Sequence, residues 1–215
     1  MPKGFTDQEK GLIKKRLLEQ GYQQFSSFGL KKANVEELAR AAGISKGAFY
    51  LFYESKEALF MDVVEEAEVR FRQQILAEID QSEGTPRLRL YAVLKKAFTL
   101  WRTIPILRQF TRADYEMISS RISMDKLEEH IQADQAFLHE LIDRCNRAGI
   151  PFRVTAEEIN GLMYILFLTI LHEDDFGPGQ LERPMDTLVE LVTAFCLGEI
   201  TLKAMHGSQN KGITT

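Results

Sequence analysis

Hydrophobic residues recur with the spacing of an α-helix over most of this 215-residue chain, and strand patterns are nearly absent. One apolar stripe runs from Asp7 to Phe28, and another follows Ser55 as far as Ile79. This periodicity predicts an all-α fold of about nine helices.

Local signals predict where these helices begin and end. Capping boxes start at Thr6 and Thr155, each with a Glu three residues later, and Pro86 suits the first turn of a helix. Asn34, Ser45 and Ser55 are suited to capping the starts of helices, and Gly29 and Gly149 are suited to ending them. The predicted helices cover approximately residues 7–28, 34–43, 45–53, 55–79, 86–105, 106–119, 123–148, 155–172 and 184–205.

The composition excludes several classes of protein. With 45% apolar and 27% charged residues, the chain is neither disordered, nor collagen-like, nor a disulfide scaffold. Its longest apolar run, residues 162–171, is interrupted only by Thr169 and is about half the length of a membrane span. The N-terminus shows no signal peptide. Cys145 and Cys196 lie far apart in sequence, so we expect reduced thiols, a cytoplasmic location and no membrane partner.

Charge is distributed unevenly along the chain. Residues 1–56 contain ten Lys and Arg against six Asp and Glu, whereas the whole chain has a net charge of −4. A basic N-terminal part on an acidic body suggests that the N-terminus faces a polyanion. The alternative is a solvated charged face without a partner.

The segment Asn34–Tyr53 fits a helix-turn-helix, in which two short helices are separated by a tight turn at Gly43. Ala39 is small where the two helices must approach closely. Five apolar side chains can face inward, namely Val35, Leu38, Ile44, Phe49 and Phe52. The outer face and leading end of the second short helix then carry Ser45, Lys46, Gly47, Ala48, Tyr50 and Leu51, and recognition helices meet DNA with their N-terminal residues.

The sequence here resembles the DNA-binding domain of the tetracycline-repressor family of bacterial regulators, over roughly residues 7–60. The most specific part is Ala42–Gly47, followed by Tyr50 and by Ser55-Lys56-Glu57. The resemblance implies a helix-turn-helix DNA-binding domain over residues 1–54 and a helical effector-binding and dimerisation domain over residues 55–215. It also implies DNA-binding roles for Asn34, Ser45, Lys46, Gly47, Ala48, Tyr50, Leu51 and Lys56.

Within this set, the resemblance assigns phosphate contacts to Lys46, Tyr50 and Lys56, and base-reading positions to Ala48 and Leu51. The family often has Thr and His at those last two positions, and neither residue here can donate a hydrogen bond to a base. Contact with a thymine methyl group stays open to both, and DNA shape can supply further specificity. The competing interpretation is a helix pair in an ordinary bundle, with Lys46 and Lys56 as solubilising charges.

In the C-terminal part, the family resemblance implies an effector pocket, for which the candidates are Phe98, Trp101, Phe110, Tyr115, Phe137, Tyr164 and Phe167. Each of these aromatic residues can equally belong to the core. The last two predicted helices are apolar over a wide arc, and the resemblance places a dimer interface there, at Gly161, Ile165, Leu168, Leu188, Leu191, Val192 and Phe195. The alternative is a buried central helix in a monomer.

No catalytic or cofactor motif is found in the sequence, so we expect no enzyme activity and no cofactor. The run His172-Glu173-Asp174-Asp175 is not expected to bind a metal, because adjacent residues at a helix end do not share a face. The predicted function is a homodimeric repressor that binds a palindromic double-stranded DNA operator and is released by a small-molecule effector. The alternatives are an activator of the same fold, or a carrier or enzyme that keeps a vestigial helix-turn-helix.

Overall fold

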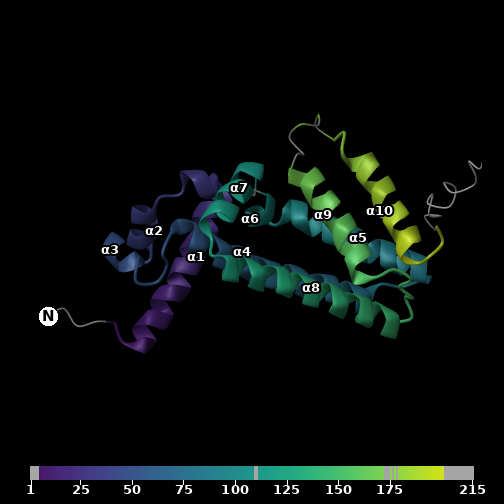
Figure 1. Ribbon diagram of the computed structural model, residues 1–215, viewed down its shortest axis with the longest axis horizontal. Coiled ribbons are helices and arrows are strands. Elements are labelled where there is room, and N and C mark those ends of the chain that lie inside the picture. The colour runs from purple at the N-terminus through teal and green to yellow at the C-terminus, as the bar shows by residue number, and fades with distance from the viewer. Residues whose placement is uncertain (1–4, 109–110, 172–174, 176, 178, 201–215) are drawn as a thin grey trace, which may run out of the picture.

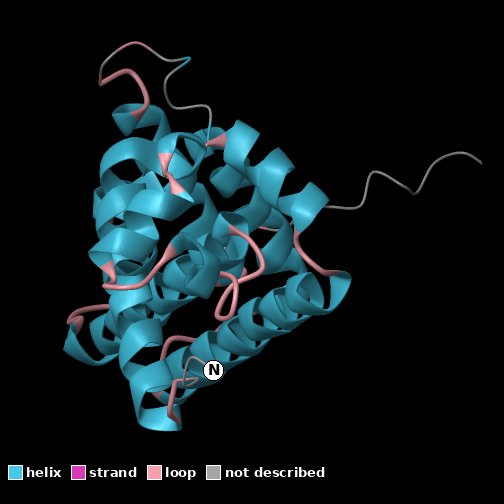
Figure 2. Ribbon diagram, turned by 90° about the vertical axis from the view of Figure 1, so that its left-hand side faces the viewer, coloured by secondary structure: helices cyan, strands magenta, loops and turns pink. Residues whose placement is uncertain are grey.

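A computed structural model of the chain describes residues 5–108, 111–171, 175, 177 and 179–200. Within these residues it is all-helical, as predicted, and it contains no strand (Figure 2). The ten helices are α1 (Asp7–Lys32), α2 (Val35–Ala41), α3 (Lys46–Phe49), α4 (Lys56–Gln81), α5 (Pro86–Thr103), α6 (Pro105–Arg108), α7 (Arg112–Arg121), α8 (Met124–Arg147), α9 (Ala156–Leu171) and α10 (Glu182–Cys196).

Most of the predicted boundaries are confirmed because they depend on local capping. Thr6 and Glu9 form a capping box at the start of α1. At the start of α9, Thr155 accepts a hydrogen bond from the backbone N–H of Glu158, whose carboxylate accepts one in return. The helix expected over residues 106–119 is instead two helices, α6 and α7, because Thr111 begins a new helix with a capping box of its own.

Three other boundaries differ from the prediction. Helix α1 continues to Lys32 across a kink at Gly29. Helix α3 is shorter than expected, because Tyr50 already forms its C-cap. Helix α10 ends at Cys196, and the rest of the helix predicted to reach Met205 lies largely beyond residue 200, outside the described residues.

The helices form an elongated molecule, with α1, α2 and α3 at one end and α9 and α10 toward the other (Figure 1). One apolar core holds α1–α3 against the first half of α4, and includes Ile106, Leu107 and Ile118. A second core packs Ile75 and Ile79 of α4 against α5, α8, α9 and α10. The division predicted after residue 54 therefore falls at the start of a helix that belongs to both cores.

Lys56 connects the start of α4 to the end of α1 through hydrogen bonds. Its Nζ donates hydrogen bonds to the carbonyl oxygens of Leu30, Lys31 and Ala33 at 2.8, 3.1 and 3.0 Å. These three acceptors match the three donors of an ammonium group. Carbonyls at a helix end have no partner within the helix, so the contact stabilises the junction between α1 and α2.

We expect Lys56→Met to lower the free energy of unfolding by about 1–3 kcal/mol, because the partly buried carbonyls of Leu30 and Ala33 and the exposed carbonyl of Lys31 lose their donor. Lys46→Met, at an exposed lysine ten positions earlier, is the matched control and should leave stability unchanged. Urea unfolding followed by circular dichroism measures both variants. Equal stability of the two variants would show that the Lys56 contacts contribute nothing.

Candidate nucleic-acid interface

The turn between α2 and α3 is fixed by backbone geometry that the sequence prescribes. Gly43 has a φ of +79°, in the left-handed region that favours glycine. The N–H of Ile44 donates to the carbonyl of Ala39 at 2.9 Å, and that of Gly43 donates to Arg40 at 3.0 Å. This pair of bonds is a Schellman motif, which ends α2 and turns the chain toward α3.

Packing sets which face of α3 is free. Phe49 is fully buried, and the other residues predicted to face inward, Val35, Leu38, Ile44 and Phe52, belong to or pack against the same core. Ser45 caps α3, since its hydroxyl accepts a hydrogen bond from the N–H of Ala48 at 3.1 Å. A helix of four residues is too short to be stable alone, so these contacts hold it in place.

The predicted DNA-contacting side chains lie on the outside of this unit. Asn34, Ser45, Lys46, Gly47, Tyr50 and Leu51 are exposed, and Ala48 is partly exposed. Leu51 is 74% exposed. Among the described residues, the ammonium of Lys46 has no hydrogen bond or ion pair, and the ring of Tyr50 meets that of Phe49 edge-on at 5.5 Å.

Asn34 and Lys56, which were both predicted to contact DNA, have different roles in the structure. Asn34 caps α2, as expected, by accepting a hydrogen bond from the N–H of Glu36 at 2.8 Å. The phosphate contact predicted for Lys56 does not fit the structure, because the three carbonyls at the end of α1 occupy all of its donors. Lys56 therefore positions the interface and does not form part of its surface.

Gly47 has no structural reason to be glycine within this chain. It does not have a positive φ, and a Cβ built on it would meet only the hydroxyl of Ser45, at 3.9 Å. Glycine weakens a helix relative to alanine, so its presence on the exposed face of α3 has a cost without an internal benefit. The open space over Gly47 would let the helix approach another molecule's backbone closely.

Comparison with known proteins agrees with this geometry. Residues 17–63 match the family described as "Bacterial regulatory proteins, tetR family". The chain is 37% identical over 59 residues to the HTH-type transcriptional regulator YdgC of Bacillus subtilis, and 40% identical over 52 residues to YerO of the same organism. The likeness to the TetR family is therefore shown for this N-terminal part of the chain.

These sequence matches are local. They cover 27% and 24% of this chain, and 30% and 18% of YdgC and YerO, so the chain spans less than a third of either relative. Solved structures extend the likeness of the fold. Thermus thermophilus FadR, determined in complex with lauroyl-CoA, has a TM-score of 0.61 at 19% identity, over 93% of this chain and 99% of that one. Bacillus halodurans FadR has a TM-score of 0.58 at 17% identity, over 91% and 97%.

A polar network that the sequence did not indicate connects α1, α4 and α8. The hydroxyl of Tyr53 donates to Asp62 at 3.0 Å, and Lys14 and Lys126 pair with the same carboxylate. Burial and the neighbouring Asp62 raise the pKa of Tyr53. Burial opposes ionisation of Asp62, but Lys126, Tyr53 and Lys14 together hold its pKa below the usual value.

Glu57 and Arg16 are two further residues near the site that the sequence did not indicate. Glu57 is only 2% exposed and pairs with Arg121 at 3.1 Å. This ion pair joins the first turn of α4 to α7. The guanidinium of Arg16 on α1 lies beside the turn, with Nη1 3.6 Å from where a Cβ on Gly43 would be. Neither pairing leaves a pattern in the local sequence, because the partners lie far apart along the chain.

The predicted effector pocket is not assembled as expected. Trp101 packs edge-on against Phe71 with ring centroids 6.1 Å apart, and Phe137 packs against the second core, and both are partly buried. Tyr115 and Tyr164 are exposed on α7 and α9. Phe110 and the side chain of Phe167 lie outside the described residues, as does His172-Glu173-Asp174.

Phe98 is the member of that set that lines a depression. The depression lies between α5 and α10 and holds about 180 Å³, and its other lining residues are Lys95, Thr99, Arg102, Thr103, Glu182 and Asp186. Ligand pockets usually hold 300–1,000 Å³, so this depression is smaller than a typical effector site.

The predicted dimer residues divide into two groups. Gly161, Ile165, Leu168, Leu188 and Leu191 are exposed on α9 and α10, as an interface requires. Phe195 is partly buried. Val192 is only 7% exposed and packs within the second core of its own chain, so its side chain is less available to a partner than the others.

The two glycines of the helix-turn-helix should respond to alanine in opposite directions. Gly43→Ala places a Cβ at positive φ, and we expect a loss of about 1–2 kcal/mol. Gly47→Ala enters open space in a helix, so we expect no loss and a gain of at most about 1 kcal/mol. Thermal unfolding of the two variants beside wild type tests this, and destabilisation by Gly47→Ala would mean that Gly47 has an internal structural role.

Proposed function

We propose that the protein is a DNA-binding transcriptional regulator that acts as a homodimer on a palindromic operator, represses transcription there and is released by a small-molecule effector. The observation that carries the proposal is the outer face of α3, where exposed Lys46, Tyr50 and Leu51 surround a glycine that the fold itself does not need. The match of residues 17–63 to the TetR family supports it.

The surface suits contact with both parts of a DNA duplex. Lys46 and the hydroxyl of Tyr50 can bind phosphates, which position a recognition helix without reading sequence. Ala48 and Leu51 have only apolar groups to offer a base, and the thymine methyl is the apolar feature of the major groove. We therefore infer an operator with thymines under α3 in each half-site, and further discrimination through DNA shape.

Lys46→Ala should weaken binding to every duplex by a similar factor and reduce the slope of log affinity against log salt by about one per half-site. A duplex selected from a random library, and an unrelated duplex, serve as probes in fluorescence anisotropy at several salt concentrations. Arg147→Ala, which removes an exposed charge at the end of α8, is the control and should change neither quantity. Binding that is absent for all duplexes, or that does not depend on salt, would contradict the proposed function.

Dimerisation is supported by the exposed apolar residues of α9 and α10. Ile165 and Leu191 are 61% and 51% exposed, and Tyr164, Leu168 and Leu188 add to the same two helices. A two-fold pair of such surfaces would bury them, and helix-turn-helix dimers address half-sites about one DNA turn apart.

We expect the double variant Ile165→Glu, Leu191→Glu to be monomeric, because buried carboxylates at a two-fold interface would lose their hydration and repel one another. Sedimentation equilibrium should give the 24.6 kDa mass of one chain for the variant and twice that for wild type. Ile131→Glu, at a 47% exposed position on α8, is the matched control and should stay dimeric. A monomeric wild type would contradict this part of the proposal.

Release by an effector would work through α4, which shares one core with the helix-turn-helix and another with the body. An effector that binds one orientation of α4 more tightly shifts the population toward it. The two helix-turn-helix units of a dimer would then no longer match the spacing of the half-sites.

A further inference from the structure

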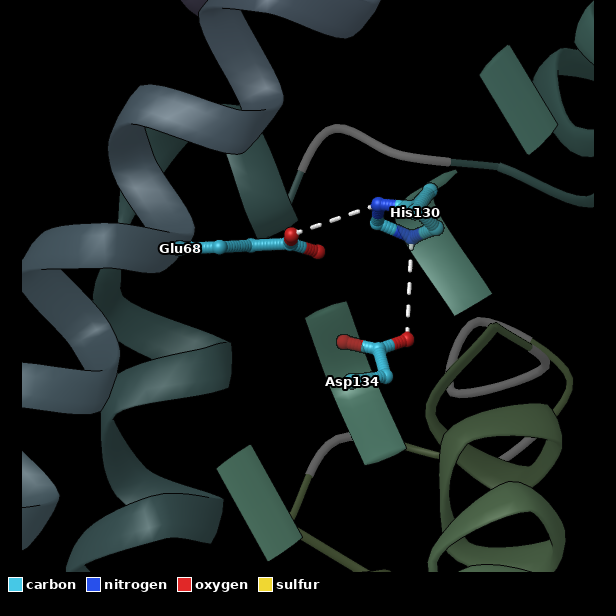
Figure 3. A group of neighbouring side chains, drawn as sticks. All are labelled: Glu68, His130 and Asp134. Atoms are coloured by element: carbon cyan, nitrogen blue, oxygen red, sulfur yellow. Dashed lines mark ion pairs between the residues drawn. The ribbon is translucent and has the colours of Figure 1, made fainter. Parts of the chain in front are cut away.

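Three side chains that can bind a metal meet where α4 packs against α8. Glu68 comes from α4, and His130 and Asp134 come from α8 (Figure 3). His130 and Asp134 are four residues apart, a spacing that places them on one face of the helix. One ligand atom can be chosen from each residue so that all three atoms lie within 4.8 Å of one another.

Both contacts of His130 are longer than a hydrogen bond. Since an ion binds only one of the two ring nitrogens, one of these contacts is close to the length of an edge of its coordination shell. Nδ1 of His130 lies 3.7 Å from Oε2 of Glu68, and Nε2 lies 3.7 Å from Oδ2 of Asp134. Hydrogen bonds of this kind are about 2.7–3.2 Å long. Two ligands bound to Zn²⁺ at about 2.0–2.2 Å in a tetrahedron are roughly 3.3–3.6 Å apart.

Burial gives an independent indication of a ligand. Nδ1 of His130 is buried without a hydrogen-bond partner, which is unusual for a polar atom in a protein interior. Glu68 is only 8% exposed, so its carboxylate is largely removed from water. A buried lone pair beside a buried carboxylate is suited to a cation.

We propose that Glu68, His130 and Asp134 bind one divalent transition-metal ion, with Zn²⁺ as the best match. A ring nitrogen combined with carboxylate oxygens favours Zn²⁺ and its neighbours over Ca²⁺ and Mg²⁺, which prefer oxygen alone. Whichever ring nitrogen binds the ion, the other faces a carboxylate.

Arg72 is the competitor of the ion at this site. Its Nη2 lies 3.3 Å from Oε2 of Glu68 and 2.7 Å from Oδ1 of Asp134. The guanidinium therefore already neutralises part of the charge that a cation would need. Removing Arg72 should therefore strengthen metal binding, whereas removing a ligand should weaken it.

The site has a defined place in the molecule. An ion bound there would connect α8 to α4, the helix whose first residue, Lys56, is hydrogen-bonded to the end of α1. The proposal does not depend on DNA binding, and its test uses the metal ion alone.

The test is isothermal titration of the full-length protein, freed of any affinity tag and stripped with chelator, with ZnCl₂. Visible absorption of the Co²⁺ form reports the ligand geometry. We expect one ion per chain for wild type, at least tenfold weaker binding for His130→Ala, and tighter binding for Arg72→Gln. His139→Ala, which removes an exposed histidine from the same helix, is the control and should bind as wild type.

Glu68→Gln provides a second variant that keeps the shape of the side chain, and it should also weaken binding at least tenfold. Circular dichroism establishes that each variant is folded before titration. The proposal is overturned if wild type takes up no Zn²⁺, or if folded His130→Ala and Glu68→Gln bind it as tightly as wild type. It is equally overturned if His139→Ala alone removes the binding.

Discussion

The packing of α4 into two cores is the constraint on which the rest of the structure depends. Its first half completes the core of the helix-turn-helix, and Ile75 and Ile79 of its second half belong to the core of the body. Lys56 at its start is hydrogen-bonded to the end of α1, and Glu57 pairs with Arg121 of α7. Packed side chains and hydrogen bonds therefore connect α4 to the helix-turn-helix at one end and to the second core at the other.

The sequence predicted those features that depend on neighbours along the chain. The caps at Thr6, Asn34, Ser45 and Ser55 are confirmed because each side chain bonds to a backbone group two or three residues away. The turn at Gly43 is confirmed for the same reason. The inward face of the helix-turn-helix was also predictable, because a short amphipathic unit leaves few ways to bury its apolar residues.

Features that depend on distant partners were not predictable in this way. Lys56 was expected on the DNA surface, but the carbonyls that it binds are 23 to 26 residues earlier in the chain. Helical spacing identified Trp101 and Phe137 as apolar positions without showing which neighbour covers them. Val192 was assigned to an interface for the same reason, since periodicity cannot distinguish a chain's own core from a partner.

Helix α3 is held in place by its contacts with the rest of the chain. Helix α3 has four residues, one of them a glycine that lowers its helical stability, and its position depends on the buried ring of Phe49 and the cap from Ser45. Apart from Ser45, which is exposed and also caps α3, the side chains that hold α3 and those that face outward are different residues. Exposed residues such as Lys46 and Leu51 can therefore change without altering the fold, whereas changes at Phe49 or Gly43 would disturb it.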